Sequence, residues 1–331
     1  MVSIKDVAKH AGVAISTVSK VLNHYPNVSE ATKKKVNEAI AELGFVPNAV
    51  AAALSSKQSG RVALLINLST QRQAIDEISM RYLSGAISRA VELNLDVITV
   101  FFSMIRDKTR EEIIRYFQSQ SIDGIIIFGM SREDTVLHEL VESQIFKIVL
   151  VDAPVINAST SCVWVDQEQA QYDVVRHTIR MGSYPYKRLL YIAGKKNAYV
   201  TEGRLRGVER IAEEMELEVT VRDGEFSELA ARNITLEEGE AADIIVCASD
   251  LMAIGAMRAL MDMDVFHPVC GFDGITLMGY AGMQMNTAKQ DFAAIAARAL
   301  EEVNRLLAGG EGEEVIVGHT LERLQYLDII C

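Results

Sequence analysis

The stretch AISTVSKVLN, residues 14–23, decides how the N-terminal part of this 331-residue chain folds. Its apolar residues Val18, Val21 and Leu22 recur at helical spacing, which leaves small hydroxyl side chains and one lysine on the opposite face. Another short helix pattern precedes it, and a tight turn at Gly12 joins the two. Two short helices joined in this way are typical of a helix-turn-helix. In that motif the second helix enters the major groove of DNA, where hydroxyl groups and lysine bind bases and phosphates.

The flanking residues predict a three-helix head over residues 1–46. Ser3 and Asp6 match a capping box, in which a hydroxyl and a carboxylate three residues later satisfy free N–H groups at the start of a helix. Ser29 is expected to cap the third helix, and Gly44 is expected to end it in the left-handed conformation that glycine adopts freely. The head is therefore expected to be all-α.

Residues 47–58 follow the head as a segment that can order into a short helix. Asn48 follows Pro47 and is positioned to cap a helix of one or two turns, and the alanines after it favour helix. A helix this short is marginal alone in water, so it would order only when another molecule or segment holds it. Leu54 at its end would be buried in a base step of the minor groove. The alternative interpretation is a plain linker, and composition does not decide between the two.

From Arg61 onward the periodicity changes, and short apolar runs alternate with amphipathic helix patterns. This alternation predicts parallel sheets covered by helices on both faces. The pattern stops after Val165 and starts again at Arg188, so we predict two Rossmann-like lobes of similar build. Two such lobes leave a cleft at the C-terminal ends of their strands, which is where open parallel sheets bind ligands.

The chain is thus predicted to have three parts. They are the helix-turn-helix head over 1–46, a hinge helix or linker over 47–58, and a bilobed α/β core over 59–331. Within the core the expected segments are a first lobe over about 61–165, a long C-terminal helix over 289–308 that crosses back to it, a second lobe over about 186–290, and a tail strand over 314–317 in that second lobe.

The net charge of −12 is unevenly distributed along the chain. Residues 1–60 carry seven lysines and four acidic residues, a net charge of +3, which leaves −15 on the remaining residues. A basic head on an acidic body binds phosphate with the head alone, because the body repels DNA. The charge distribution therefore supports the DNA-binding interpretation of the head.

Motifs of enzymes, metal sites and exported proteins are missing from the sequence. GxGxxG, GxxxxGK[ST], GxSxG and HExxH do not occur, so we expect neither an enzyme nor a cofactor. The four cysteines lie far apart, and the six histidines form no pair at ligand spacing, so no metal site is expected. Neither a cleavable signal nor a run of about 18 apolar residues is present, which predicts a cytoplasmic protein that does not enter a membrane.

Several landmark motifs follow one another in order along the head and again along the core. In the head they are Ile4-Lys5-Asp6-Val7-Ala8, Ala11-Gly12-Val13, Ser16–Asn23, Val28-Ser29 and Gly44-Phe45-Val46-Pro47-Asn48. In the core they are Asp123-Gly124-Ile125, Val151-Asp152, Arg204–Gly207, Ser249–Ala256 and Gly271-Phe272-Asp273. With these motifs the chain resembles the lactose/galactose repressor (LacI/GalR) family of bacterial transcriptional regulators, closely over the head and more loosely over nearly all of the core.

The resemblance implies a transcription regulator, expected to be a repressor, with a core like that of type I periplasmic binding proteins. It implies a homodimer or a tetramer on a pseudo-palindromic double-stranded operator in the bacterial cytoplasm, associated with the nucleoid. A hinge helix would open the minor groove through Leu54, and a small effector between the two lobes would alter the affinity for the operator.

The resemblance also assigns roles to individual residues of the head and hinge. Those that match base-reading positions are Ile15, Ser16 and Lys20. Those that match backbone-contact positions are Thr17, Ser19, Asn23 and Ser29, and the candidates in the hinge are Asn48 and Leu54.

A second set of candidates is expected in the cleft between the lobes. Arg204 matches the ligand-binding arginine of the family and Phe226 matches an aromatic wall. The positions that match binders of ligand hydroxyls are Asp152, Ser249 and Asp273, and further candidates near strand ends are Asn67, Arg72, Lys195 and Asp250. Arg204 could instead be a structural ion-pair partner, and Asp250 could simply cap a helix, because it stands at the start of one.

The class of effector stays open at this point. Arg72, Lys195 and Arg204 together would suit a phosphorylated sugar, whereas a cleft lined mainly by aspartates would suit a neutral sugar. A nucleobase or a protein co-regulator is the alternative. Two other functions are weighed. A sugar carrier would have no use for a DNA-binding head. An enzyme with an accessory DNA-binding module would need a set of catalytic residues, which the sequence does not show.

Overall fold

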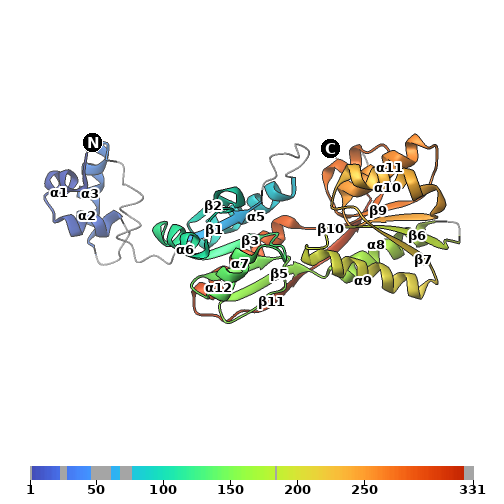
Figure 1. Ribbon diagram of the computed structural model, residues 1–331. Coiled ribbons are helices and arrows are strands. Elements are labelled where there is room, and N and C mark those ends of the chain that lie inside the picture. Colours follow the sequence, from blue (N-terminus) through green and yellow to red (C-terminus); the bar gives the residue numbers. More distant parts are fainter. Residues whose placement is uncertain (1, 23–27, 46–60, 68–76, 183–184, 324–331) are drawn as a thin grey trace. The chain divides into compact units, whose positions relative to one another are not determined.

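The computed structural model describes residues 2–22, 28–45, 61–67, 77–182 and 185–323 (Figure 1). The chain divides into two compact units, residues 1–59 and residues 60–331, which are described separately. The predictions for Asn23, Asn48, Leu54, Arg72 and the hinge at 47–58 lie outside the described residues. In the described part, no helix is long and apolar enough to cross a membrane.

The head contains three helices, as its apolar pattern predicts: α1 (Ile4–Ala11), α2 (Ile15–Leu22) and α3 (Glu30–Leu43). They bury one shared cluster of small and β-branched side chains. The buried members are Val7 and Ala8 from α1, Val18 and Val21 from α2, and Val36 and Ala39 from α3. The polar face of α2 is consequently turned away from the core of the head.

The expected caps of the head helices are present. Asp6 accepts hydrogen bonds from the backbone N–H of Ser3 at 2.9 Å and from its hydroxyl at 2.7 Å. Ser29 caps α3, because its Oγ accepts a hydrogen bond from the backbone N–H of Thr32 at 3.3 Å. Gly12 and Gly44 follow α1 and α3 with φ of 64° and 59°, a left-handed conformation in which a side chain would be strained.

The core is built on two six-stranded sheets, one in each lobe. The first has the order β11-β5-β4-β3-β1-β2 and is parallel throughout, and the second has the order β12-β10-β9-β8-β6-β7 and is parallel except for β12. The strands are β1 (Arg61–Ile66), β2 (Val97–Phe101), β3 (Ile122–Phe128), β4 (Lys147–Val151), β5 (Thr160–Val165), β6 (Arg188–Ala193), β7 (Glu218–Asp223), β8 (Ile244–Cys247), β9 (Val269–Asp273), β10 (Asn286–Gln290), β11 (Glu314–Val317) and β12 (His319–Glu322).

Helices cover both faces of each sheet, as near-continuous apolar strands require (Figure 1). In the first lobe α5 and α12 cover one face and α6 and α7 cover the other, so the side chains of β1 alternate between two separate hydrophobic clusters. In the second lobe α8 and α9 cover one face, and α10 and α11 cover the other. The helices of the core are α5 (Glu77–Leu93), α6 (Arg110–Ser119), α7 (Thr135–Glu142), α8 (Gln167–Met181), α9 (Tyr199–Glu214), α10 (Glu228–Glu238), α11 (Asp250–Asp262) and α12 (Phe292–Leu307), with short 3₁₀ turns at Phe102–Met104, Gly239–Ala241 and Thr276–Tyr280.

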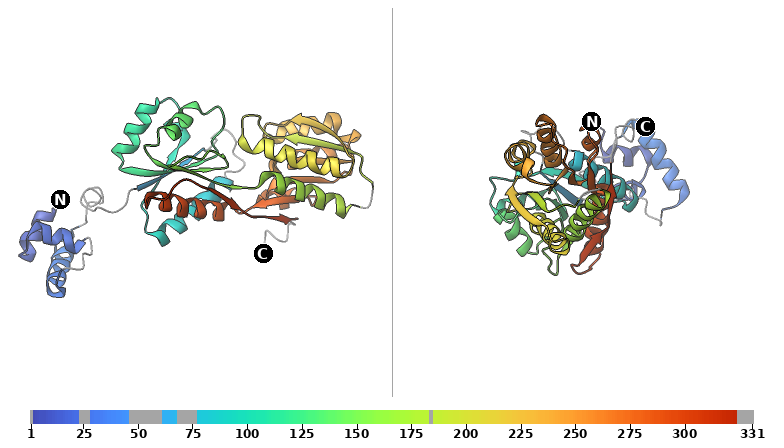
Figure 2. Two further views of the ribbon diagram at one scale, coloured as in Figure 1. Left: turned by 90° about the horizontal axis from the view of Figure 1, so that it is seen from below. Right: turned by 90° about the vertical axis from the view of Figure 1, so that its right-hand side faces the viewer.

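The long C-terminal helix does return to the first lobe. Helix α12 packs along α5, and Figure 2 shows the two side by side. Their backbones approach closely at Gly85, where a Cβ atom would lie 2.2 Å from the carbonyl oxygen of Ala293. Any side chain at residue 85 would therefore push the two helices apart.

The prediction for the tail strand is wrong. Strand β11 joins the first lobe, where it pairs in parallel with β5, and the second lobe instead gains β12, antiparallel to β10. The reason is that α12 ends in the first lobe, so the chain adds a strand there before it returns. The chain consequently crosses between the lobes three times, at 165–167, at 290–292 and at 317–319.

Candidate functional site

The exposed face of α2 carries the residues predicted to read DNA. Ile15 is 45% exposed, and Ser16 and Lys20 are also exposed. Thr17 and Ser19 are half-buried between this face and the core of the head. An exposed apolar side chain beside hydroxyl groups and one cation has the groups that contact thymine methyls, base edges and phosphates. Within the head, the structure thus presents these side chains to solvent on one helix.

A cavity of about 540 Å³ lies between the two lobes of the core, at the C-terminal ends of their strands. It has the size of sites that bind small molecules. The predicted candidates that line it are Asn67, Asp152, Lys195, Arg204, Phe226, Ser249 and Asp273. Further polar and aromatic side chains line it that the sequence did not single out, namely Ser79, Tyr82, Phe128, Ser131, Asp134, Asn197, Tyr199, Gln290 and Phe292.

Arg204 is held rigidly in the wall of this cavity. Its side chain is 3% exposed, and its Nε donates a hydrogen bond to Oε1 of Gln167 at 2.8 Å. One terminal nitrogen donates to the carbonyl oxygen of Ala248, and the guanidinium lies 3.7 Å from the centre of the Phe272 ring. The other terminal nitrogen lies 3.6 Å from Oδ1 of Asp273. Arg204 therefore has both a structural ion-pair role and a place in the cavity wall.

Asp273 ends strand β9 with an unusual backbone, at φ of 120°. Its Oδ1 accepts a hydrogen bond from Nε2 of Gln290 at 3.0 Å. Burial raises the pKa of this carboxyl to about 6, although the nearby Arg204 and the hydrogen bond from Gln290 act in the opposite direction. The carboxylate is thus oriented by neighbours from two elements of the second lobe, α9 and β10.

Asp152 faces the same cavity from the first lobe, directly after β4. Its backbone is left-handed, with φ of 64°, and burial raises the pKa of its carboxyl to about 6. The hydroxyl of Tyr82 donates a long hydrogen bond of 3.3 Å to Oδ2. The other oxygen, Oδ1, is buried and has no hydrogen-bond partner in the part of the chain that the structure describes. A buried acceptor without a donor favours binding of a molecule that supplies one.

Phe226 and Lys195 stand at the part of the cavity formed by the second lobe. The Phe226 ring lies against Gly194, where a Cβ atom would come within 2.1 Å of the ring. Glycine is therefore required beside the ring. Lys195 follows Gly194 and is exposed, so its ammonium group is accessible to a ligand at the rim.

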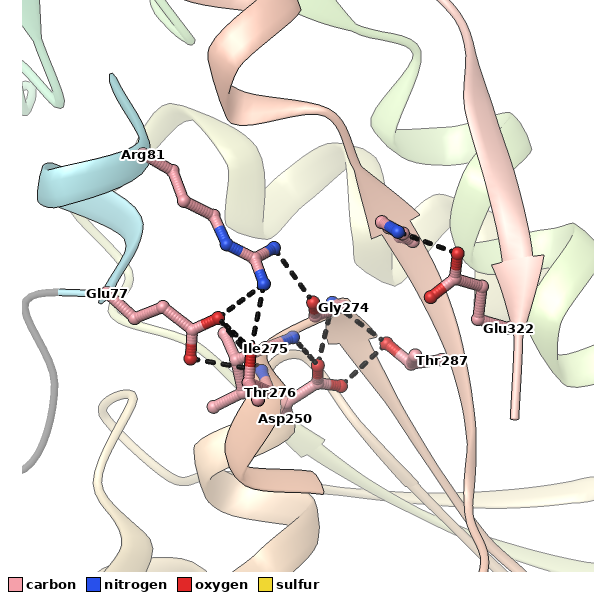
Figure 3. Close-up of polar contacts among 9 residues, drawn as sticks. Glu77, Arg81, Asp250, Gly274, Ile275, Thr276, Thr287 and Glu322 are labelled. Atoms are coloured by element: carbon pink, nitrogen blue, oxygen red, sulfur yellow. Dashed lines mark hydrogen bonds and ion pairs between the residues drawn. The ribbon is translucent and has the colours of Figure 1, made fainter. Parts of the chain in front are cut away.

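Asp250 does not line the cavity, which corrects its assignment as an effector-binding residue. It is fully buried, and its carboxylate accepts hydrogen bonds from the backbone N–H groups of Gly274 and Ile275 at 2.7 and 2.9 Å and from the Thr287 hydroxyl at 2.7 Å (Figure 3). It is not the helix cap either, because the side chain of Ser249 caps α11. Asp250 shapes the loop after β9, which in turn positions Asp273.

The loop that Asp250 shapes is bound on its other side by the first lobe (Figure 3). Arg81 of α5 donates to the carbonyl oxygen of Gly274 at 3.1 Å and to the hydroxyl of Thr276 at 2.9 Å. Glu77 accepts hydrogen bonds from the backbone N–H of Thr276 at 2.9 and 3.0 Å and from its hydroxyl at 2.6 Å. We call these contacts of Glu77 and Arg81 with residues 274–276 the α5 latch.

A second set of interlobe contacts joins the loop after β3 to the loop after β6. Ser131 and Ala198 form an antiparallel bridge, and the backbone N–H of Arg132 donates to the carbonyl oxygen of Asn197 at 2.9 Å. The Arg132 side chain lies 4.6 Å from the centre of the Tyr199 ring and binds Glu202 at 3.0 Å. We call these contacts of residues 131–132 with residues 197–202 the β3 latch. Residues of both latches border the cavity: Ile275 belongs to the α5 latch, and Ser131, Asn197, Ala198 and Tyr199 belong to the β3 latch.

Two family models match the chain. Residues 3–48 match the bacterial regulatory proteins of the lacI family, and residues 79–309 match the periplasmic binding proteins and sugar binding domain of the LacI family. The protein belongs to the LacI family. It is therefore a DNA-binding transcriptional regulator with an effector-binding core, and not an enzyme.

Individual relatives agree over almost the whole length of this LacI-family regulator. It is 30% identical over 319 residues to the HTH-type transcriptional regulator RegA of Clostridium saccharobutylicum, a match that covers 90% of this chain and 91% of RegA. It is 27% identical over 327 residues to the lactose operon repressor of Escherichia coli (strain K12), with 95% and 86% covered. A lac repressor dimer bound to operator and the anti-inducer ONPF has the same fold, with a TM-score of 0.81, 23% identity, and 97% and 98% of the two chains covered.

The side chains that sequence reasoning missed in this regulator come from helices, strand ends, loops and a crossing between the lobes. Tyr82 lies inside α5, where an aromatic residue at helical spacing indicates core packing and not a cavity wall. Gln290 and Phe292 flank the second crossing between the lobes. A usable signal for Gln290 was its position at the end of a strand, but that strand, β10, was not predicted because residues 286–290 are mostly polar.

Proposed function

We propose that this LacI-family regulator is a repressor that binds a pseudo-palindromic operator as a homodimer, and that a sugar bound between its lobes controls operator affinity. The observation that carries the proposal is the wall of the interlobe cavity, where three aspartates, an arginine, amide groups and aromatic rings meet. Carboxylates and guanidinium groups bind vicinal hydroxyls, and aromatic faces cover the apolar side of a sugar ring. The match to a sugar binding domain supports this class of effector.

We favour a sugar without a phosphate group, with a sugar phosphate as the second candidate. A phosphate is bound by several convergent donors. The guanidinium of Arg204 is already engaged by Gln167, Ala248 and Asp273. The exposed Lys195 at the rim is the observation that favours the second candidate.

For the head, we propose that Ile15, Ser16 and Lys20 contact bases in the major groove. Further proposed contacts, to the DNA backbone or through the hinge, are Thr17, Ser19, Asn23, Ser29, Asn48 and Leu54. Replacement of Lys20 by alanine is expected to cost about 1–3 kcal/mol at one base position and little elsewhere. A uniform loss over all operator variants would instead make Lys20 a phosphate contact.

We propose that the effector acts by changing the angle between the lobes. The α5 latch and the β3 latch join the lobes through hydrogen bonds, ion pairs and the contact of Arg132 with the Tyr199 ring, so a ligand that lies between the lobes can shift their balance. The binding of an effector would then alter the distance between the two heads of a dimer. The proposed site of action is the bacterial cytoplasm, where the protein would bind operators on the chromosome.

The proposal is tested with the full-length protein in three steps. Duplexes that bind are selected from a random library, sugars and sugar phosphates are screened by thermal shift, and every stabilising compound is added to a fluorescence anisotropy titration of the selected operator. We expect a sugar that raises Tm to change the operator Kd at least about tenfold, a typical size of allosteric coupling. A protein that binds no duplex, or that binds a sugar without any change in operator Kd, would overturn the proposal.

A further inference from the structure

Among the described residues that line the interlobe cavity, two buried oxygen atoms have no hydrogen-bond partner: Oδ1 of Asp152 and Oε1 of Gln290. Both can only accept hydrogen bonds. The orientation of the Gln290 amide is fixed, because its Nε2 donates to Asp273 and its oxygen must therefore point elsewhere. The empty hydrogen-bonding positions of this wall consequently call for donors on the ligand.

The charged groups around these atoms do not balance. The carboxylate of Asp273 has a cationic partner, since Nη2 of Arg204 lies 3.6 Å from it. The Asp152 carboxylate forms no ion pair with the described residues and accepts one hydrogen bond from them, from the hydroxyl of Tyr82. Arg204 attracts this carboxylate as well, but it is bound to Asp273. Lys195 is exposed at the rim and forms no ion pair with the described residues. A ligand that covers Asp152 and excludes water from it leaves a buried negative charge, unless the ligand itself is positively charged there.

A cluster of aromatic rings adjoins Asp152 through Tyr82. The Tyr82 ring, whose hydroxyl binds Asp152, lies 4.6 Å from the ring of Phe128 and 5.1 Å from that of Phe292. All three rings line the cavity and are buried. The faces of aromatic rings attract ammonium groups, and they do so more strongly where water is excluded. A carboxylate bound by the hydroxyl of one ring of this aromatic cluster is a suitable site for an amine.

We infer that the effector is an amine-bearing sugar, whose ammonium group binds Asp152 among the rings of Tyr82, Phe128 and Phe292. Its hydroxyls bind Asp273 and the free oxygen of Gln290 on the opposite lobe. The inference rests on the proposed function, because it assigns a class of ligand to the same cavity. The ammonium group joins the two lobes, since it neutralises a charge of the first lobe while the rest of the ligand binds the second.

The test is isothermal titration calorimetry of the full-length protein at pH 7 with matched sets of three sugars. Each set contains an amino sugar, its parent sugar and its neutral N-acetyl derivative: glucosamine, glucose and N-acetylglucosamine, with the corresponding galactose and mannose sets. We expect the amine of one set to bind at least tenfold tighter than both neutral sugars of that set. A parent or N-acetyl sugar that binds as tightly as the amine would overturn this inference and leave the proposed function intact. If no sugar of any set binds, this inference is overturned, and the proposed function then depends on the wider thermal-shift screen.

Two variants separate a charge effect from a general loss of binding. Asp152→Asn keeps the shape and removes the charge, so the amine should lose at least tenfold in affinity while its parent sugar changes less than threefold. Asp273→Asn is the matched control and should weaken both sugars by a similar factor, because Asp273 binds hydroxyls. Equal losses of both sugars in Asp152→Asn would assign Asp152 to a hydroxyl and overturn the inference. Thermal unfolding of both variants checks that the core is intact.

Discussion

Asp152 and Asp273 face one cavity from different lobes, yet their surroundings differ sharply. Asp273 belongs to a network that orients it without a ligand, in which Gln290 and Arg204 orient the carboxylate and Gln167 orients the arginine. Asp152 has one long hydrogen bond from Tyr82 and one oxygen with no partner. The second lobe is therefore preorganised for binding, and the first lobe supplies a contact that only the ligand completes. Such a division of tasks suits a protein in which ligand binding must move one lobe relative to the other.

The largest effect is expected from removal of the centre of the preorganised network. Arg204→Ala leaves Asp273 buried without its cation, which should lower the free energy of unfolding by about 3–5 kcal/mol and abolish effector binding. Urea unfolding and calorimetric titration measure the two effects. Arg206→Ala is the matched control on the same helix, because its ion pairs with Glu168 and Glu202 are exposed, and it should cost less than about 1 kcal/mol. Similar losses in both variants would contradict the central position of Arg204.

A smaller loss of stability is expected when Asp250, which supports the loop that carries Asp273, is replaced. Asp250→Ala removes the acceptor of two backbone N–H groups and one hydroxyl, and it should lower the free energy of unfolding by about 2–3 kcal/mol. Effector affinity should fall as well, since the loop that carries Asp273 loses its support. If the variant keeps wild-type stability, Asp250 does not have the structural role assigned to it here.

The carboxyl of the first lobe should make stability depend on pH in an unusual direction. Burial raises the pKa of Asp152 from its ordinary value to about 6, so the folded state holds its proton more tightly than the unfolded chain does. The stability that this carboxyl contributes to the folded state is fully present below about pH 4 and is lost as the pH rises through about 6. The free energy of unfolding changes by on the order of 1–2 kcal/mol over this range. Arg204, Asp273 and Tyr82 face this carboxyl and modify the change. Urea unfolding of wild type and Asp152→Asn at pH 4.5 and pH 7 should show a smaller pH effect in the variant, and parallel profiles would exclude Asp152 as the source.

The smallest effect on stability is expected when a latch is opened. The main consequence should be a change in the coupling between effector binding and operator binding. Arg81→Ala opens the α5 latch and Arg132→Ala opens the β3 latch, each with a loss of about 1 kcal/mol of unfolding free energy. Each variant should change the operator Kd severalfold when no effector is present, and each should keep the side chains that bind the sugar. Fluorescence anisotropy measures the change. A double variant whose effects simply add would show that the latches act independently.

The regular parts of the core were predictable, because their signals are local. Residues 148–151 form an uninterrupted apolar run after Lys147, and β4 has the predicted bounds 147–151. In the head, the capping residues Ser3 and Ser29 and the glycine at residue 44 mark helix ends that the structure has. Periodicity and caps depend on neighbours in sequence, which explains this success.

The incorrect predictions concern partners that are distant in sequence. The short strand at 314–317 has no signal that says which sheet it joins, and only the return of α12 to the first lobe decides it. A carboxylate in the first turn of a helix fits a cap or a ligand contact equally well, and the loop at Gly274 decides the role of Asp250. Seven residues that line the cavity had nevertheless been named as candidates from the sequence, because they match family positions or stand at strand ends.

The three crossings of the chain between the lobes limit how the core can move. Each crossing is short, and all of them leave from the neighbouring strands β5 and β11 of one sheet or from β10 and β12 of the other. Three tethers at one margin permit rotation about a single line and resist sliding and twisting. Different molecules bound in the cavity can then rotate one lobe relative to the other by different angles, but the axis of that rotation stays nearly the same. The cavity wall can thus diverge toward new metabolites while the mechanical output stays the same.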